Sequence, residues 1–181
     1  MKQALLVGNN DYPGSANDLY GCVNDTENLR SLLTKEFGFE SAGIRILTDK
    51  RATKEAILGG LSDLVAKAAG GDTLLVHYSG HGSQVPDEDG DERSDRKDEV
   101  ICPRDFSWDG CWISDDDLSD IFSGLAKDVH LEVLLDCCHS GTGTREIALG
   151  ARAAGVSAGI AAALGGPPRT ARVRLMPQPA S

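Results

Sequence analysis

Two stretches decide the fold: Val76–Gly82, which reads VHYSGHG, and Leu131–Thr144, which reads LEVLLDCCHSGTGT. Each begins as an apolar run and ends abruptly in small and polar residues, a pattern typical of a buried strand that emerges at the edge of a sheet. His81 follows the first run and Cys138 follows the second. In open α/β sheets the ligand crevice lies just beyond the carboxyl ends of the strands. We therefore expect both side chains at one sheet edge, where a cysteine and a histidine can form a nucleophile and its base.

Strand and helix signals alternate around these two stretches. Short apolar runs predict four strands, and apolar residues at helical spacing behind capping residues predict three helices. This order predicts an α/β fold with a mostly parallel sheet flanked by helices. The expected strands are Lys2–Val7, Ser41–Leu47, Asp72–Ser79 and Val129–Leu135, and the expected helices run from about Asn24 to Phe37, from Thr53 to Gly70 and from Ser114 to Leu125.

Two segments carry few core signals. Ser83–Asp98 is a polar excursion, with eight acids between Asp87 and Glu99, and we expect it to contribute no core. After Arg145 the chain is rich in Ala, Gly, Pro and Arg. We therefore expect a catalytic domain over residues 1–145 and a linker or tail over residues 146–181.

Composition narrows the function classes. A formal net charge of −10 argues against a partner that is a nucleic acid or an anionic membrane, because both need basic patches. No stretch approaches the ~20 apolar residues of a membrane span, and the first residues do not resemble a signal peptide. The odd count of five cysteines predicts free thiols in a reducing compartment, and so a cytoplasmic protein.

The expected chemistry needs a thiolate and a stabilised oxyanion. Cys138 would attack as the thiolate with His81 as its base. The backbone N–H groups of Gly82 and Cys138 are the expected oxyanion donors. Strand alternation predicts that Cys137 points into the core, and it disfavours His139 as the base. His77 is expected to be a strand histidine that plays no part in the reaction.

Four segments resemble one family. His77–Gly82 and Asp136–Gly141, with Gly21–Asp25 and Ile113–Leu118, are similar to motifs of the metacaspase and orthocaspase branch of the caspase-like (C14) peptidases. The resemblance runs from Met1 to about Arg145. It implies the caspase-like three-layer fold, without the strands of the small subunit, and a His–Cys dyad that cleaves peptide bonds through a thioester.

The resemblance also implies a specificity pocket. It places Cys22, Asp25, Ser79 and Asp136 around the substrate residue that precedes the scissile bond. Two carboxylates favour an Arg or Lys side chain there, in a protein or peptide substrate. Like charges would meet if that residue were aspartate, so we expect no cleavage after Asp.

No cofactor is expected for the chemistry itself, although the resemblance raises calcium as an activator. Its ligands would come from Asp98, Glu99, Asp115 and Asp116. Acids at a helix N-terminus also have a plain structural explanation in the helix dipole.

Two other functions are compatible with the residues. Because no strand signals for a small subunit follow residue 145, we expect either a truncated form or a chain that relies on a separate partner chain. The first alternative function is that of a catalytically silent adaptor or regulator of caspase-like fold. A zinc hydrolase using His77, His81 and a cysteine is the second alternative. On a strand, however, residues four apart lie ~13 Å apart, which is too far for both histidines to bind one zinc ion.

Overall fold

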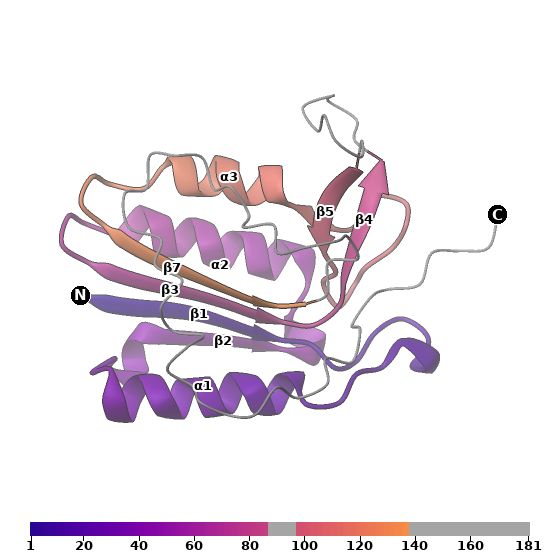
Figure 1. Ribbon diagram of the computed structural model, residues 1–181, viewed down its shortest axis with the longest axis horizontal. Coiled ribbons are helices and arrows are strands. Elements are labelled where there is room, and N and C mark those ends of the chain that lie inside the picture. Colours follow the sequence, from indigo (N-terminus) through magenta and orange to yellow (C-terminus); the bar gives the residue numbers. More distant parts are fainter. Residues whose placement is uncertain (87–96, 138–181) are drawn as a thin grey trace.

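Four parallel strands form the centre of the molecule, in the order β2-β1-β3-β7 (Figure 1). This computed structural model describes residues 1–86 and 97–137. The predicted, mostly parallel sheet is confirmed, and each strand lies close to its expected position. The strands are β1 (Lys2–Gly8), β2 (Ile44–Thr48), β3 (Thr73–Ser79) and β7 (His130–Asp136).

Helices cover both faces of this sheet (Figure 1). Helix α1 (Cys22–Glu36) packs on one face, and α2 (Lys54–Lys67) and α3 (Asp115–Ser123) pack on the other. Both predicted helix starts are confirmed: the Thr53 side chain accepts from the Ala56 N–H, and Ser114 forms a capping box. No helix in the described ranges is long and apolar enough to cross a membrane.

The alternation along each strand divides the core into two parts. On the α2 and α3 side the sheet buries residues such as Leu5, Val76 and Tyr78. On the α1 side it buries Ala4, Leu6 and Leu75. Residues one apart thus face opposite layers, which is why these central strands read as continuous apolar runs.

Strand order reverses beside β1. The chain runs from β1 over one face to β2, then returns over the other face to β3, so that β1 lies between them. The carboxyl ends of β1 and β3 therefore form a topological switch point, where α/β sheets bind their ligands. The Asn9 N–H donates to the Ser79 carbonyl at 2.9 Å and holds these two ends together.

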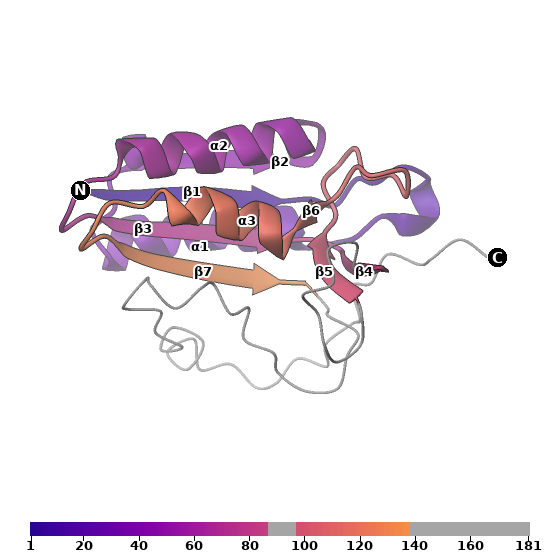
Figure 2. The same ribbon diagram turned by 90° about the horizontal axis from the view of Figure 1, so that it is seen from above.

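A second, antiparallel sheet lies beyond the carboxyl ends of the parallel strands (Figure 2). It contains β4 (Gly82–Pro86), β5 (Lys97–Ile101) and β6 (Ile113–Ser114). The prediction that Ser83–Asp98 carries no core is therefore wrong, since Val85 is only 5% exposed. A strand this short has little intrinsic preference for its conformation, and its pairing with β5 supplies the stability.

The remaining differences are at element ends. Helix α1 begins at Cys22 rather than near Asn24, and the first residues expected in the second strand form a 3₁₀ turn instead. The 3₁₀ turns are Ser15–Asn17, Ser41–Gly43 and Asp49–Arg51.

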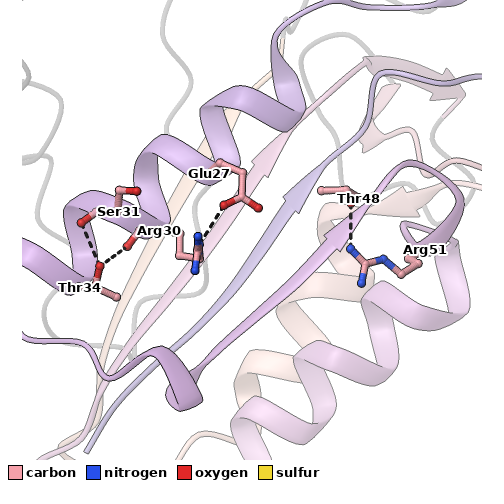
Figure 3. A network of polar contacts seen from close by, with 6 residues as sticks. All are labelled: Glu27, Arg30, Ser31, Thr34, Thr48 and Arg51. Carbon is pink, nitrogen blue, oxygen red and sulfur yellow. Dashed lines mark hydrogen bonds and ion pairs between the residues drawn. The ribbon is translucent and has the colours of Figure 1, made fainter.

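The outer face of α1 carries its own polar contacts (Figure 3). Arg30 pairs with Glu27 at 2.9 Å, one turn apart, and the Thr34 hydroxyl donates to the carbonyls of Arg30 and Ser31. Beyond the helix, Arg51 donates to Thr48 at 3.1 Å. Exposed pairs of this kind add a few tenths of a kcal/mol each, so the buried face holds the helix to the sheet.

Gly8 lets α1 approach the end of β1. A Cβ atom at this position would lie 2.6 Å from the Cys22 carbonyl oxygen, a backbone atom that cannot turn aside. Gly8→Ala should therefore destabilise the fold by about 1–3 kcal/mol, as overpacking does. Urea unfolding would measure the change.

Gly59→Ala is the matched control, because this exposed glycine of α2 has no atom within 4 Å of the added methyl group. A helix-interior alanine should stabilise by roughly 0.5–1 kcal/mol there. Equal effects of the two substitutions would contradict the close approach at Gly8.

Candidate active site

His81 lies at the switch point, in the two-residue link between β3 and β4. Its Nε2 is 2.8 Å from the Asn17 carbonyl oxygen, and its ring packs in an edge-to-face arrangement with the Tyr12 ring at a centroid distance of 4.7 Å. A carbonyl can only accept, so Nε2 carries the hydrogen and Nδ1 carries the lone pair of the neutral ring. Nδ1 is buried, and no described residue hydrogen-bonds to it. This is the tautomer that a general base acting through Nδ1 requires.

The strand ladder directs the Gly82 N–H away from β5. Gly82 lies opposite Ile101, and the Cys102 N–H donates to the His81 carbonyl at 3.0 Å. This pattern makes Gly82 and Ile101 a non-hydrogen-bonded pair, whose N–H groups point out of the ladder. In the described part of the chain β4 pairs with β5 alone. The Gly82 N–H is therefore not used by the sheet, as an oxyanion donor must be.

The four expected pocket residues come together on the α1 side of the same sheet edge. The Ser79 hydroxyl donates to Asp25 at 3.2 Å, which joins the end of β3 to the first turns of α1. Asp136 lies opposite Ser79 in the parallel register, so both side chains leave the same face of the sheet. Cys22 is one helical turn before Asp25 and is fully buried.

The three polar residues of this group differ in solvent exposure. Ser79 is inaccessible, Asp25 is half-buried and Asp136 is exposed. Two carboxylates of different exposure thus lie on the same side of this sheet edge.

Of the remaining predicted residues, the structure describes Cys137 and His77 but not those after residue 137. Cys137 packs against the α2 and α3 side of the core, so the predicted orientation of this residue is confirmed. His77 is a buried strand residue on β3. Cys138 and His139 lie outside the described residues, as do the 146–181 segment and the boundary expected at residue 145.

Sequence reasoning missed the groups that hold His81. The Asn17 carbonyl, the Tyr12 and Tyr78 hydroxyls and the Cys102 backbone all contact it. Two of these are backbone atoms, which any residue type supplies. The tyrosines alone left a signal, since a buried Tyr hydroxyl needs a polar partner.

The acids proposed for calcium do not assemble a site within the described residues. Val100 pairs with Ser114, so the β5 acids Asp98 and Glu99 lie on the strand next to the start of α3. However, no three His, Cys, Asp or Glu side chains there gather closely enough to hold a metal ion. Among the described residues this finding gives no support to a zinc site at His77 and His81. We assign calcium no step in the chemistry.

The geometry defines an α/β domain with a buried histidine at its switch point, and comparisons with known proteins show its family. The chain matches the family model "Metacaspase, peptidase C14 domain" over residues 2–145. It is 43% identical over 147 residues to Metacaspase-1 of Kluyveromyces lactis, which covers 78% of this chain and 34% of that protein. It is 40% identical over 145 residues to Metacaspase-7 of Arabidopsis thaliana, which covers 77% and 35%.

A solved structure agrees with this placement. The crystal structure of protein GSU0716 from Geobacter sulfurreducens superposes with a TM-score of 0.64 at 29% identity, covering 78% of this chain and 52% of that one. The fold is therefore caspase-like, and the chain belongs to the metacaspase, peptidase C14 family. It spans about a third of the length of these curated metacaspases.

Calcium activation is a prediction that a titration can test. If Asp115 and Asp116 are ligands, isothermal titration should give a saturable heat at millimolar calcium, as weak extracellular-type sites do. The heat should fall in an Asp115→Asn/Asp116→Asn variant but persist in Asp120→Asn, which removes an exposed charge later in α3. Absence of any heat in the wild-type chain would reject calcium binding.

Proposed function

We propose that this chain carries the catalytic centre of a cysteine endopeptidase that cleaves proteins or peptides after Arg or Lys. The observation that carries the proposal is the hydrogen bond from His81 Nε2 to the Asn17 carbonyl, because it leaves the Nδ1 lone pair buried and available. Family membership supports the same reaction class, a C14 cysteine peptidase. Cys138 is the nucleophile in this proposal.

The proposed acylation balances as follows. His81 Nδ1 takes the proton of the Cys138 thiol, and the sulfur attacks the scissile carbonyl carbon to form a C–S bond. The carbonyl oxygen becomes an oxyanion, to which the N–H groups of Gly82 and Cys138 donate. As the C–N bond breaks, Nδ1–H protonates the leaving amine, which leaves a thioester.

Deacylation uses the same groups. A water molecule gives one proton to His81 Nδ1 while its oxygen attacks the thioester carbon. The C–S bond then breaks and the proton passes to the Cys138 sulfur. The free carboxylic acid leaves, and both side chains return to their starting states.

Charge supports the substrate class. Asp25 accepts a hydrogen bond from Ser79, Asp136 lies opposite Ser79 in the sheet register, and the whole chain carries a formal net charge of −10. An Arg or Lys side chain would neutralise this pocket, whereas an aspartate would be repelled.

We propose that the active enzyme has an additional polypeptide segment that covers the outer edge of β7. In the described residues β7 pairs with β3 alone and so forms one edge of the parallel sheet. The middle of β7 is half-buried and apolar, with Val133, Leu134 and Leu135, and such an edge requires a further strand or cover. A separate small-subunit chain, or the additional length that the relatives have, would supply it. The free thiols of Cys102 and Cys111 support a reducing, cytoplasmic setting.

Peptide hydrolysis tests the reaction and the catalytic dyad. Fluorogenic peptides ending in Arg or Lys should be cleaved and the Asp-ended peptide should not. Cys138→Ala and His81→Ala should each lower kcat by at least about 1,000-fold, as loss of a nucleophile or base does. Activity that survives in Cys138→Ala would exclude the dyad. A wild-type chain that is silent on every peptide and whose Cys138 resists alkylation would favour the adaptor function.

The pocket is tested by neutralising its carboxylates. Asp25→Asn and Asp136→Asn should each reduce kcat/KM for Arg peptides by roughly 10–100-fold, the loss of one charge-assisted hydrogen bond. Asp120→Asn is the charge-matched control and should change kcat/KM less than about twofold. An equal loss in all three variants would show that net charge, and not the pocket, attracts the substrate.

A further inference from the structure

Two buried tyrosine hydroxyls hold the backbone on both sides of the His81 side chain. The His81 N–H donates to the Tyr12 hydroxyl at 2.8 Å. The Tyr78 hydroxyl lies 2.8 Å from the His81 carbonyl oxygen and 2.7 Å from the Cys102 carbonyl oxygen. The two hydroxyls are 3.2 Å apart, and that of Tyr12 also lies 3.2 Å from the Cys102 carbonyl. The pair thus forms one continuous network.

The protons of this network can be counted. Each hydroxyl has one proton to donate, and the Tyr12 oxygen already accepts from the His81 N–H. Both carbonyls receive a proton when Tyr78 donates to the His81 carbonyl and Tyr12 donates to the Cys102 carbonyl. Burial raises the pKa of both phenols above its ordinary value, so they stay uncharged donors.

The His81 carbonyl and the Gly82 N–H belong to the same peptide group. A trans peptide is planar, and its C=O and N–H point in opposite directions. Donors from Tyr78 and from the Cys102 N–H hold the carbonyl oxygen on one side. The Gly82 N–H is therefore directed to the other side, away from the network. Hydrogen bonds to a carbonyl also polarise its peptide and strengthen the N–H as a donor.

Gly80 makes room for this arrangement. A Cβ atom there would lie 2.5 Å from the Tyr78 hydroxyl and 2.6 Å from the Tyr12 hydroxyl. Any other residue at position 80 would push both hydroxyls away from the His81 peptide. Tyr12 comes from the loop before α1 and Tyr78 from β3, so two distant parts of the chain meet at this one link.

We propose that Tyr12 and Tyr78 are positioning residues of the reaction: Tyr12 fixes the base through the His81 N–H, and Tyr78 fixes the oxyanion donor through the His81 carbonyl. This inference rests on the proposed function and assigns the positioning of its two catalytic groups to two different hydroxyls. The division predicts two different defects, because an attack on a carbonyl needs both base and oxyanion donor whereas alkylation of a thiol needs only the base.

Tyr12→Phe and Tyr78→Phe separate the two roles, with Tyr20→Phe, an 87% exposed tyrosine, as the control. Iodoacetamide reacts with the thiolate and forms no oxyanion. Its rate at Cys138, resolved by mass spectrometry with Cys138→Ala as the blank, should fall about tenfold at pH 7 in Tyr12→Phe, with the midpoint of the pH profile moved upward. Burial raises the pKa of the Cys102 and Cys111 thiols, so these react more slowly and do not obscure the signal.

Tyr78→Phe should leave that alkylation profile close to wild type. It should instead lower kcat for the Arg peptide by ~10-fold or more with KM within about twofold, because an oxyanion donor acts in the transition state. Thermal unfolding of each variant sets an assay temperature well below its midpoint, so that loss of folded protein does not imitate either defect.

The outcomes separate the inference from the proposed function. Wild-type behaviour of both variants, or the same mixed defect in both, would overturn the positioning roles while the peptidase function stands. If Cys138 of the wild-type chain is alkylated no faster than free cysteine at the same pH, the Cys–His pair itself fails, and the roles of both tyrosines fail with it. The alkylation arm decides the role of Tyr12 even where peptide turnover is too slow to measure.

Discussion

The site depends on one tight passage of the chain. Gly80 and His81 carry the backbone from the last residue of the parallel sheet to the first residue of the antiparallel sheet. Two sheets of different hydrogen-bonding pattern meet here, so the link has hardly any conformational freedom of its own. The buried hydroxyls beside Gly80 and the Asn17 carbonyl beside the imidazole fix what freedom is left. The position of the His81 side chain is thus a property of the whole fold and not of a mobile loop.

At its carboxyl edge, the parallel sheet carries apolar side chains on one face and polar side chains on the other. On the α2 and α3 side the apolar core continues to the end of β7, where Cys137 still packs against it. On the α1 side the core gives way to Ser79, Asp25 and Asp136. The period of two along a strand is what allows a hydrophobic layer and a charged pocket to lie back to back.

Much of the fold could be predicted from the sequence because its signals are local. Long apolar runs marked β1, β3 and β7, and the capping residues Thr53 and Ser114 marked the starts of two helices. Alternation also gave the orientation of Cys137 correctly. Strands β4, β5 and β6 escaped prediction because their pairing with one another stabilises them more than their own residues do.

The site could be predicted only in part, for a similar reason. Residue types pointed to His81 and Gly82, and the family resemblance placed Asp25 and Ser79 around one pocket. What orients His81 lies 64 and 69 residues away along the chain, in the Asn17 carbonyl and the Tyr12 hydroxyl. A backbone carbonyl leaves no trace in a sequence, so the preferred tautomer of the base could come only from three-dimensional contacts.

The loop between β1 and α1 therefore differs from an ordinary connection. Surface loops commonly accept insertions, and engineers choose them for tags, reporter domains and new chain termini. Here the segment from Tyr12 to Asn17 supplies a hydroxyl to the backbone and a carbonyl to the imidazole of the same histidine. Its length is set by two anchor points on one residue. An insertion there would alter the proton position on a side chain far along the sequence, while the sheet and its helices stayed intact.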